Sequence, residues 1–134
     1  MAKLRHIAMQ VPDLQESAAF YEKLFDLDRV HDVETEYGNA VMLSDGTVNL
    51  TLLHFPEGSK GGLHGPDWAG LHHIGFVVDD KEQTAENVKA LGGSFYMQLP
   101  EGIPGIDAET KYKDPNGLVF DLADHDWSQS KRRQ

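Results

Sequence analysis

Residues 4–24 read LRHIAMQVPDLQESAAFYEKL, and residues 71–91 read LHHIGFVVDDKEQTAENVKAL. Aligned at a shift of 67 positions, the second stretch repeats Leu4, His6, Ile7, Val11, Asp13 and Leu24 of the first. A second match, at a shift of 71, pairs Gly46, Val48 and His54 with Gly117, Val119 and His125. Two copies of one supersecondary unit explain both matches. We expect module 1 to span about residues 3–55 and module 2 about 70–126, with a linker at 56–70 and a tail at 127–134.

Each module shows the same order of local patterns. The runs 4–11 and 71–78 are rich in Ile, Val and Phe and predict strands. Asp13 and Asp80 follow them as helix caps, and apolar residues then recur at helical spacing. Three shorter strand segments complete each module, at 29–36, 39–44 and 47–55, and at 94–99, 107–113 and 118–125. The chain is therefore predicted to be one α+β domain, residues 1–134, made of two βαβββ modules.

Composition excludes several classes of function. Twelve Lys and Arg against 22 Asp and Glu leave a net charge of −10, which repels phosphate backbones and anionic lipid. We therefore expect no nucleic-acid and no membrane partner. The absence of cysteine excludes disulfides and thiolate chemistry. No apolar signal segment and no stretch of about 20 apolar residues occurs, so we expect a soluble, cytoplasmic protein.

Three polar residues stand out on strands that are otherwise mostly apolar. Strand alternation places His6 and His73 at equivalent positions, on the face that the helices leave open. Asp121 lies in the last predicted strand. Burying these polar groups costs free energy unless each interacts with a partner, and one divalent metal ion could bind all three. A hydrogen-bonded or half-exposed side chain explains each residue alone but not the symmetry of the histidines. His72 has the opposite parity and is expected to be structural.

The stretches RHIAMQVPDLQESAAFYEKLFDL (5–27), LHHIGFVVDD (71–80) and DPNGLVFDL (114–122) together resemble the vicinal oxygen chelate superfamily. That superfamily includes glyoxalase I, extradiol dioxygenases, fosfomycin-resistance transferases, methylmalonyl-CoA epimerase and bleomycin-binding proteins. The resemblance implies an incomplete eight-stranded barrel around a metal, with ligands from the first and last strand of each module. In this sequence, the resemblance implies that the four ligand positions are His6, Leu50, His73 and Asp121. Thr51 replaces Leu50 if the register differs by one residue.

Leucine cannot bind a metal, so the resemblance implies a set of two histidines and one carboxylate. This set leaves coordination positions open, as in extradiol dioxygenases. The main expectation is therefore an Fe(II) ring-cleaving dioxygenase acting on a small substrate with vicinal oxygens, with Mn(II), Zn(II) or Ni(II) as other possible ions. Tyr112 and His54 are expected to supply the tyrosine and histidine that those enzymes place near the substrate. His54 and His125 are also candidates for proton transfer or for supporting a ligand.

Other members of the superfamily supply the alternatives. One is a glyoxalase-like lyase or isomerase that activates a C–H bond next to a carbonyl. Another is a fosfomycin-type thiol transferase, although Ala8 stands where those enzymes have a threonine. A third, from a different class, is a metal-free bleomycin-binding type of protein, which sequesters a ligand and needs no ligand triad. The resemblance also implies a homodimer, with the metal site inside one chain or shared between two.

Overall fold

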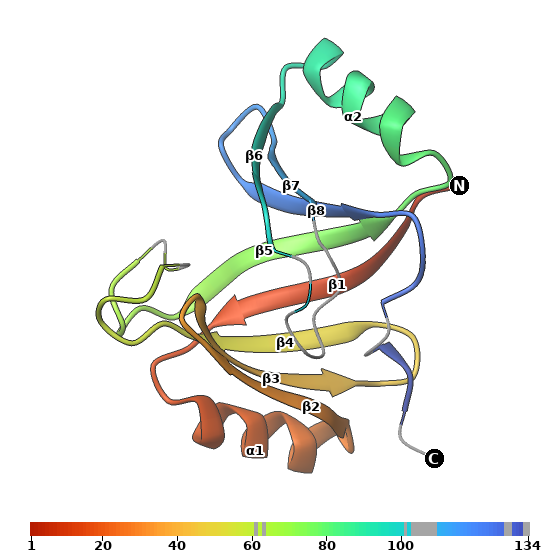
Figure 1. The fold of residues 1–134 in the computed structure, drawn as a ribbon. Coiled ribbons are helices and arrows are strands. Elements are labelled where there is room, and N and C mark those ends of the chain that lie inside the picture. Colours follow the sequence, from red (N-terminus) through yellow and green to blue (C-terminus); the bar gives the residue numbers. More distant parts are fainter. Residues whose placement is uncertain (61, 63, 101, 103–109, 128–129, 133–134) are drawn as a thin grey trace.

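The computed structural model describes residues 1–60, 62, 64–100, 102, 110–127 and 130–132. The elements follow in the order β1 (Lys3–Gln10), α1 (Leu14–Phe25), β2 (Asp28–Thr35), β3 (Gly38–Ser44), β4 (Asn49–His54), β5 (Gly70–Val77), α2 (Lys81–Ala90), β6 (Ser94–Gln98), β7 (Thr110–Lys113) and β8 (Val119–Ala123) (Figure 1). This order confirms the predicted α+β fold of two βαβββ modules. Residues 107–109 of the predicted strand 107–113 lie outside the described residues.

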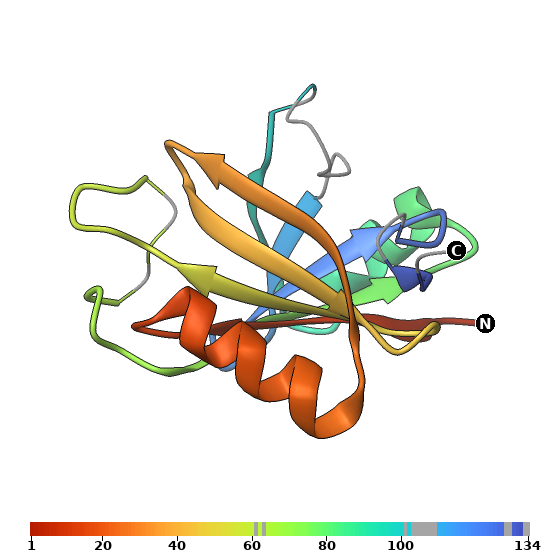
Figure 2. The ribbon, with the colours of Figure 1, turned by 90° about the horizontal axis from the view of Figure 1, so that it is seen from below.

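The described strands form one eight-stranded sheet in the order β2-β3-β4-β1-β5-β8-β7-β6. The two modules meet where β1 runs antiparallel to β5. Within the modules, β1 pairs parallel to β4 and β5 pairs parallel to β8. The sheet does not close, and the strand pairs β2–β3 and β6–β7 both bend toward the side away from α1 (Figure 2). The result is the predicted incomplete barrel, whose inner face is open at one side.

Both helices begin where the sequence predicts because an aspartate caps each one. Asp13 and Asp80 accept the backbone N–H groups of Glu16 and Gln83, each at 3.0 Å. α1 buries Ala18 against apolar side chains of β3 and β4. α2 has no fully buried residue and places the half-buried Ala85 and Val88 on the apolar cluster of module 2. Since the helices cover the outer face, the inner face is left for polar groups. Neither helix, among the described residues, is long and apolar enough to cross a membrane.

The last strands of the two modules are equivalent at a shift of 70 residues, one less than the sequence match suggests. Ala8 pairs with Thr51 on β4, whereas the equivalent Gly75 pairs with Asp121 on β8. Leu50 packs in the apolar cluster on the α1 side. The structure therefore corrects the expected ligand position at Leu50, because Thr51 is the residue on the inner face.

The tail after β8 folds back across the sheet to module 1. Trp127 is 3% exposed, and the backbone oxygen of Ser130 accepts a hydrogen bond from Ser44 Oγ at 2.5 Å. Arg132 Nη1 donates to the backbone oxygen of Asp26 at 3.0 Å and lies 3.2 Å from Asp28 Oδ1. These described tail residues therefore connect the end of module 2 to module 1.

Candidate metal centre

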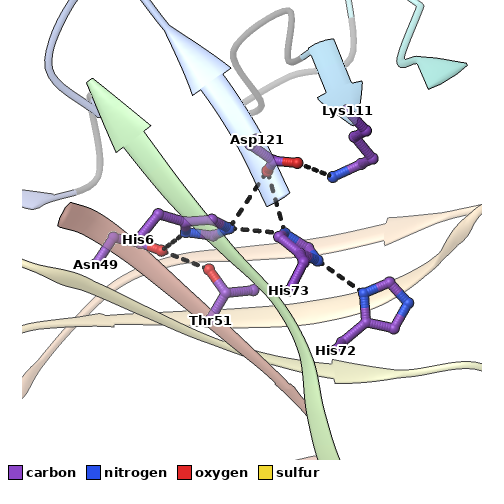
Figure 3. A network of polar contacts seen from close by, with 7 residues as sticks. All are labelled: His6, Asn49, Thr51, His72, His73, Lys111 and Asp121. Carbon is purple, nitrogen blue, oxygen red and sulfur yellow. Dashed lines mark hydrogen bonds and ion pairs between the residues drawn. The ribbon is translucent and has the colours of Figure 1, made fainter. Parts of the chain in front are cut away.

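Three buried side chains from central strands meet on the inner face of the sheet (Figure 3). His6 comes from β1, His73 from β5 and Asp121 from β8, and their exposed fractions are 3%, 6% and 0%. The Nε2 atoms of the two histidines are 2.9 Å apart. Asp121 Oδ2 lies 3.2 Å from His73 Nε2 and 3.9 Å from His6 Nε2. The structure thus brings together the three residues predicted to hold a metal.

Two of the three distances between these atoms, 2.9 and 3.2 Å, fit a single ion, whereas His6 Nε2 and Asp121 Oδ2 lie farther apart, at 3.9 Å. Ligand atoms about 2.1 Å from a metal lie about 3.0 Å apart at a right angle and about 3.4 Å apart at a tetrahedral angle. Asp121 Oδ2 is also buried without a hydrogen bond. An unsatisfied buried carboxylate oxygen is costly, and a cation at the centre of the three atoms satisfies it. The residues present therefore fit a divalent metal.

Neighbouring side chains determine which nitrogen of His6 carries the proton. Asn49 Oδ1 lies 2.7 Å from His6 Nδ1. Because an amide oxygen only accepts, Nδ1 carries the hydrogen and Nε2 presents a lone pair. Thr51 Oγ1 donates to the same Asn49 oxygen at 2.5 Å, which supports this orientation of the amide. Such outer contacts orient a histidine ligand toward a metal.

His73 has a comparable support in His72. The two Nδ1 atoms lie 2.7 Å apart. When His73 Nδ1 donates to His72, the Nε2 lone pairs of His6 and His73 face each other, an arrangement that needs a cation or a shared proton between them. His72 also stacks on Phe55, with ring centroids 5.1 Å apart, and lines the inner pocket. The prediction that His72 lies away from this face is therefore wrong.

A buried lysine, Lys111, lies beside the triad. The sequence pattern did not predict this position for it. Lys111 on β7 lies directly opposite Asp121 on β8. The lysine side chain is 8% exposed, and its Nζ atom lies 2.8 Å from Asp121 Oδ1. One carboxylate oxygen is thus held by the lysine and the other faces the histidines (Figure 3). The pairing register of β7 with β8 determines that Lys111 lies here. The sequence pattern alone did not determine that register.

The two residues predicted to lie near the substrate are on the other face of the sheet. Tyr112 stacks on Phe120 within the apolar cluster between the sheet and α2. His54 donates its Nδ1–H to the backbone oxygen of Val11 at 3.1 Å. Neither residue is among those that line the inner pocket. The structure therefore does not support the predicted catalytic roles of Tyr112 and His54.

An apolar pocket of about 100 Å³ opens next to the triad. His6 and His73 form part of its wall, and most of the other lining side chains are apolar. The remaining polar groups of its described lining are Thr35, Tyr37, Thr51, His72, Tyr96 and Lys111. An apolar pocket with a few convergent polar groups is typical of a small-molecule site.

Comparisons with known proteins agree with this architecture. A family model described as "Glyoxalase/Bleomycin resistance protein/Dioxygenase superfamily" matches residues 3–122. A mitochondrial methylmalonyl-CoA epimerase of Dictyostelium discoideum is 34% identical over 68% of this chain and 61% of its own length. An ethylmalonyl-CoA/methylmalonyl-CoA epimerase of Cereibacter sphaeroides is 29% identical over 91% of this chain and 97% of its own. A solved methylmalonyl-CoA epimerase in complex with methylmalonyl-CoA and NH4+ has a TM-score of 0.69 at 18% identity, covering 99% of both chains.

These findings overturn the predicted extradiol dioxygenase. Among the matched relatives are several epimerases. Another is a lactoylglutathione lyase of Arabidopsis thaliana, 28% identical over 87% of this chain and 42% of its own length. None of these relatives is a dioxygenase. The prediction relied on the open coordination positions of a 2-His-1-carboxylate set, and such positions serve any substrate that chelates through two oxygens. The argument for Fe(II) in particular depended on oxygen chemistry and is lost with it.

Proposed function

The chain belongs to the Glyoxalase/Bleomycin resistance protein/Dioxygenase superfamily, and we propose that it is a metal-dependent isomerase or lyase. The proposed reaction removes a proton from the carbon next to a carbonyl group in a small substrate with vicinal oxygens. The observation that carries this proposal is the convergence of His6 Nε2, His73 Nε2 and Asp121 Oδ2, an oxygen that is buried without a hydrogen bond. The epimerase and glyoxalase-type relatives support the reaction class.

His6, His73 and Asp121 are the residues that would hold the ion. Two imidazoles and one carboxylate suit borderline divalent ions such as Zn(II), Ni(II) or Mn(II). A bound ion of this kind acts as a Lewis acid that polarises a carbonyl oxygen and makes the adjacent C–H bond more acidic. Thr51, in the fourth position, already donates its hydroxyl to Asn49. An ion held by three side chains would keep coordination positions for two substrate oxygens.

The pocket residues supply the surroundings that this reaction needs. The mostly apolar lining lowers the polarity around a bound substrate, which would strengthen electrostatic interactions with the reacting group. None of the described residues that line the pocket is a carboxylate. The groups there that can accept or pass a proton are His72, Lys111 and the hydroxyls of Tyr37 and Tyr96. We propose that the acyl part of a thioester enters this pocket of about 100 Å³.

Metal analysis and proton exchange test this function together. We expect the parent protein to bind about one divalent ion per chain and to exchange the α-proton of methylmalonyl-CoA with D2O, followed by NMR. The hemithioacetal of methylglyoxal and glutathione tests the lyase branch in parallel. His73→Ala should lose metal and exchange, whereas His54→Ala, on the outer face, should keep both. A parent protein that takes up no divalent ion, or a His73→Ala variant that binds it equally well, contradicts the proposal.

We also propose that the chain forms a homodimer through α1. Phe20, Leu24 and Phe25 on this helix are 58%, 58% and 59% exposed. Contiguous exposed apolar side chains of this size are typical of an interaction surface. Light scattering should give the mass of two chains for the parent and of one chain for a Phe20→Glu, Leu24→Glu double variant. A dimer that this double variant leaves intact would exclude α1 as the interface.

A further inference from the structure

Two consecutive residues of β5, His72 and His73, both line the inner pocket. Consecutive side chains of a regular strand point to opposite faces of the sheet. A β-bulge explains the exception. On β1, Ala8 pairs with His73, and the next residue pairs with Leu71. His72 is thus an additional residue on β5, and the bulge turns it inward beside the candidate ligand His73.

The imidazole of His72 contacts both a candidate ligand and an aromatic ring. Its Nδ1 atom lies 2.7 Å from His73 Nδ1. The same imidazole stacks on Phe55, with ring centroids 5.1 Å apart and planes inclined by 30°. Phe55 directly follows β4 and is 6% exposed. A continuous series of contacts therefore runs from Phe55 through His72 to His73.

Two glycines fix the position of the Phe55 ring. Gly38, at the start of β3, has a φ of +134°, and a Cβ atom there would lie 2.6 Å from both Cδ1 and Cε1 of Phe55. A Cβ atom at Gly62 in the linker would lie 3.1 Å from Phe55 Cβ. Both distances are shorter than the optimal separation of two carbon atoms, about 3.5–4.0 Å. Because these residues lack side chains, the backbone packs closely against Phe55 at two positions and restricts its movement.

We propose that Phe55 is a positioning residue of the metal centre, which holds the imidazole of His73 in the orientation of a ligand by packing against His72. This role rests on the proposed metal-dependent function. A phenyl ring neither ligates a divalent ion through a nitrogen or oxygen atom nor transfers a proton, so its effect on metal binding passes through packing. Contacts that orient a histidine ligand typically change metal affinity about 10- to 100-fold.

A phenylalanine that only fills space predicts something different. Its replacement lowers the free energy of unfolding and leaves the metal affinity of the folded chain unchanged. Two readouts separate these roles in the full chain without substrate. The first is zinc affinity, measured by competition with a chelating dye. The second is the visible absorption spectrum of the Co(II)-loaded chain, which reports the geometry of the ligands.

Phe55→Leu should weaken zinc binding about tenfold or more and change the Co(II) spectrum. Phe55→Tyr retains a ring that stacks on His72 and should restore both readouts to nearly those of the parent. Phe95→Leu is the matched control. Phe95 is 56% exposed, contacts Tyr112 and is not among the described residues that line the pocket. This control should leave zinc affinity and the Co(II) spectrum unchanged.

A double-mutant cycle tests whether the effect passes through His72. His72→Leu removes the contact with His73 Nδ1 and should itself weaken zinc binding. In that background, Phe55→Leu should change zinc affinity less than about twofold, because the series of contacts is already broken. A tenfold effect of Phe55→Leu that persists in the His72→Leu background overturns the proposed role of His72 in the inference.

Thermal melting of each variant shows that the chain is folded, and Phe55→Met replaces Phe55→Leu if the latter does not fold. A folded Phe55→Leu or Phe55→Met variant that binds zinc as tightly as the parent, with the same Co(II) spectrum, overturns the positioning role and leaves the proposed function intact. A parent protein that takes up no divalent ion overturns the proposed function and this inference with it.

Discussion

The indole ring of Trp127 lies parallel to the imidazole of His6, with the ring centroids 4.9 Å apart and the planes inclined by 9°. His6 is thus held at its face by Trp127, at Nδ1 by Asn49 and at Nε2 by contact with His73. Trp127 belongs to the tail that returns from β8 to module 1, and it is buried. The end of the chain therefore sets the orientation of a candidate ligand near its beginning.

Trp127→Ala should weaken both the fold and the metal site. Removing the indole leaves a cavity beneath His6, and we expect a loss of about 3–5 kcal/mol in the free energy of unfolding. Metal affinity should fall about tenfold or more, because His6 loses a contact that orients it. Trp127→Phe should lose less of both. Denaturant unfolding and metal titration measure the two effects.

Trp68 provides the matched control for this change. It stacks on His64 in the linker 56–70, with ring centroids 3.9 Å apart. Trp68→Ala should leave metal affinity unchanged. Equal metal affinity in Trp127→Ala and the parent would show that the tail does not position His6.

Gly75 is the residue whose lack of a side chain admits Trp127. A Cβ atom at Gly75 would lie 2.7 Å from Trp127 Cη2 and 2.9 Å from His6 Cβ. We expect Gly75→Ala to destabilise the fold by about 1–3 kcal/mol and to weaken metal binding. In the background of Trp127→Ala the same change should cost less, because one of the two clashes is gone. Strict additivity of the two substitutions in a double-mutant cycle would contradict this packing.

Asn49 should control metal affinity through the tautomer of His6. Asn49→Leu removes the acceptor of the His6 Nδ1–H, and we expect metal affinity to fall about 10- to 100-fold. Asn49→Asp retains an acceptor and should keep metal binding. The diagnostic comparison is between these two variants, measured by competition with a chelating dye. If both bind metal equally well, the hydrogen bond to His6 does not set the ligand orientation.

The repeat in the sequence predicts much of the fold and the triad, for a physical reason. Alternation along a strand is strict, so an equivalent position in two copies of one unit faces the same way. His6 and His73 could therefore be placed together without any tertiary information. Asp121 could be added as the carboxylate in an otherwise mostly apolar strand, and the resemblance to the vicinal oxygen chelate superfamily implied its position as a ligand.

The errors arose where register or tertiary packing decides. Thr51, and not Leu50, is the residue equivalent to Asp121. The turn before β4 is one residue shorter than the turn before β8, so the match at a shift of 71 does not extend into the strands. A one-residue uncertainty in the register of β7 likewise explains why Tyr112 was predicted near the substrate, whereas Lys111 is the β7 residue on the inner face. Trp127 lies beyond the repeat, and no local pattern shows that the tail returns to β1.

Asp45 should make stability depend on acid pH. The backbone N–H groups of Val48 and Thr47 donate to its carboxylate and hold the pKa of Asp45 below its ordinary value of 3.8. A carboxyl group with a lowered folded-state pKa stabilises the fold fully above about pH 4, and the effect is lost as the pH falls through that lowered pKa. Asp45→Asn keeps an acceptor for the turn but does not titrate. The free energy of unfolding, measured from pH 2 to 7, should decrease less at acid pH for Asp45→Asn than for the parent. The same pH dependence in both proteins would contradict this account.

Asp121 should link metal binding to thermal stability. An ion present at 100 times its Kd stabilises the folded chain by about 2.7 kcal/mol, so zinc should raise the melting temperature of the parent and a chelator should reverse the rise. Asp121→Asn should abolish the rise because the anionic ligand is lost. It should also destabilise the metal-free protein by about 3–5 kcal/mol, since the buried Lys111 ammonium loses its carboxylate. Asp124→Asn, at an exposed position that contacts His125, should keep the full zinc response. A zinc-induced rise in Asp121→Asn equal to that of the parent would place the metal elsewhere.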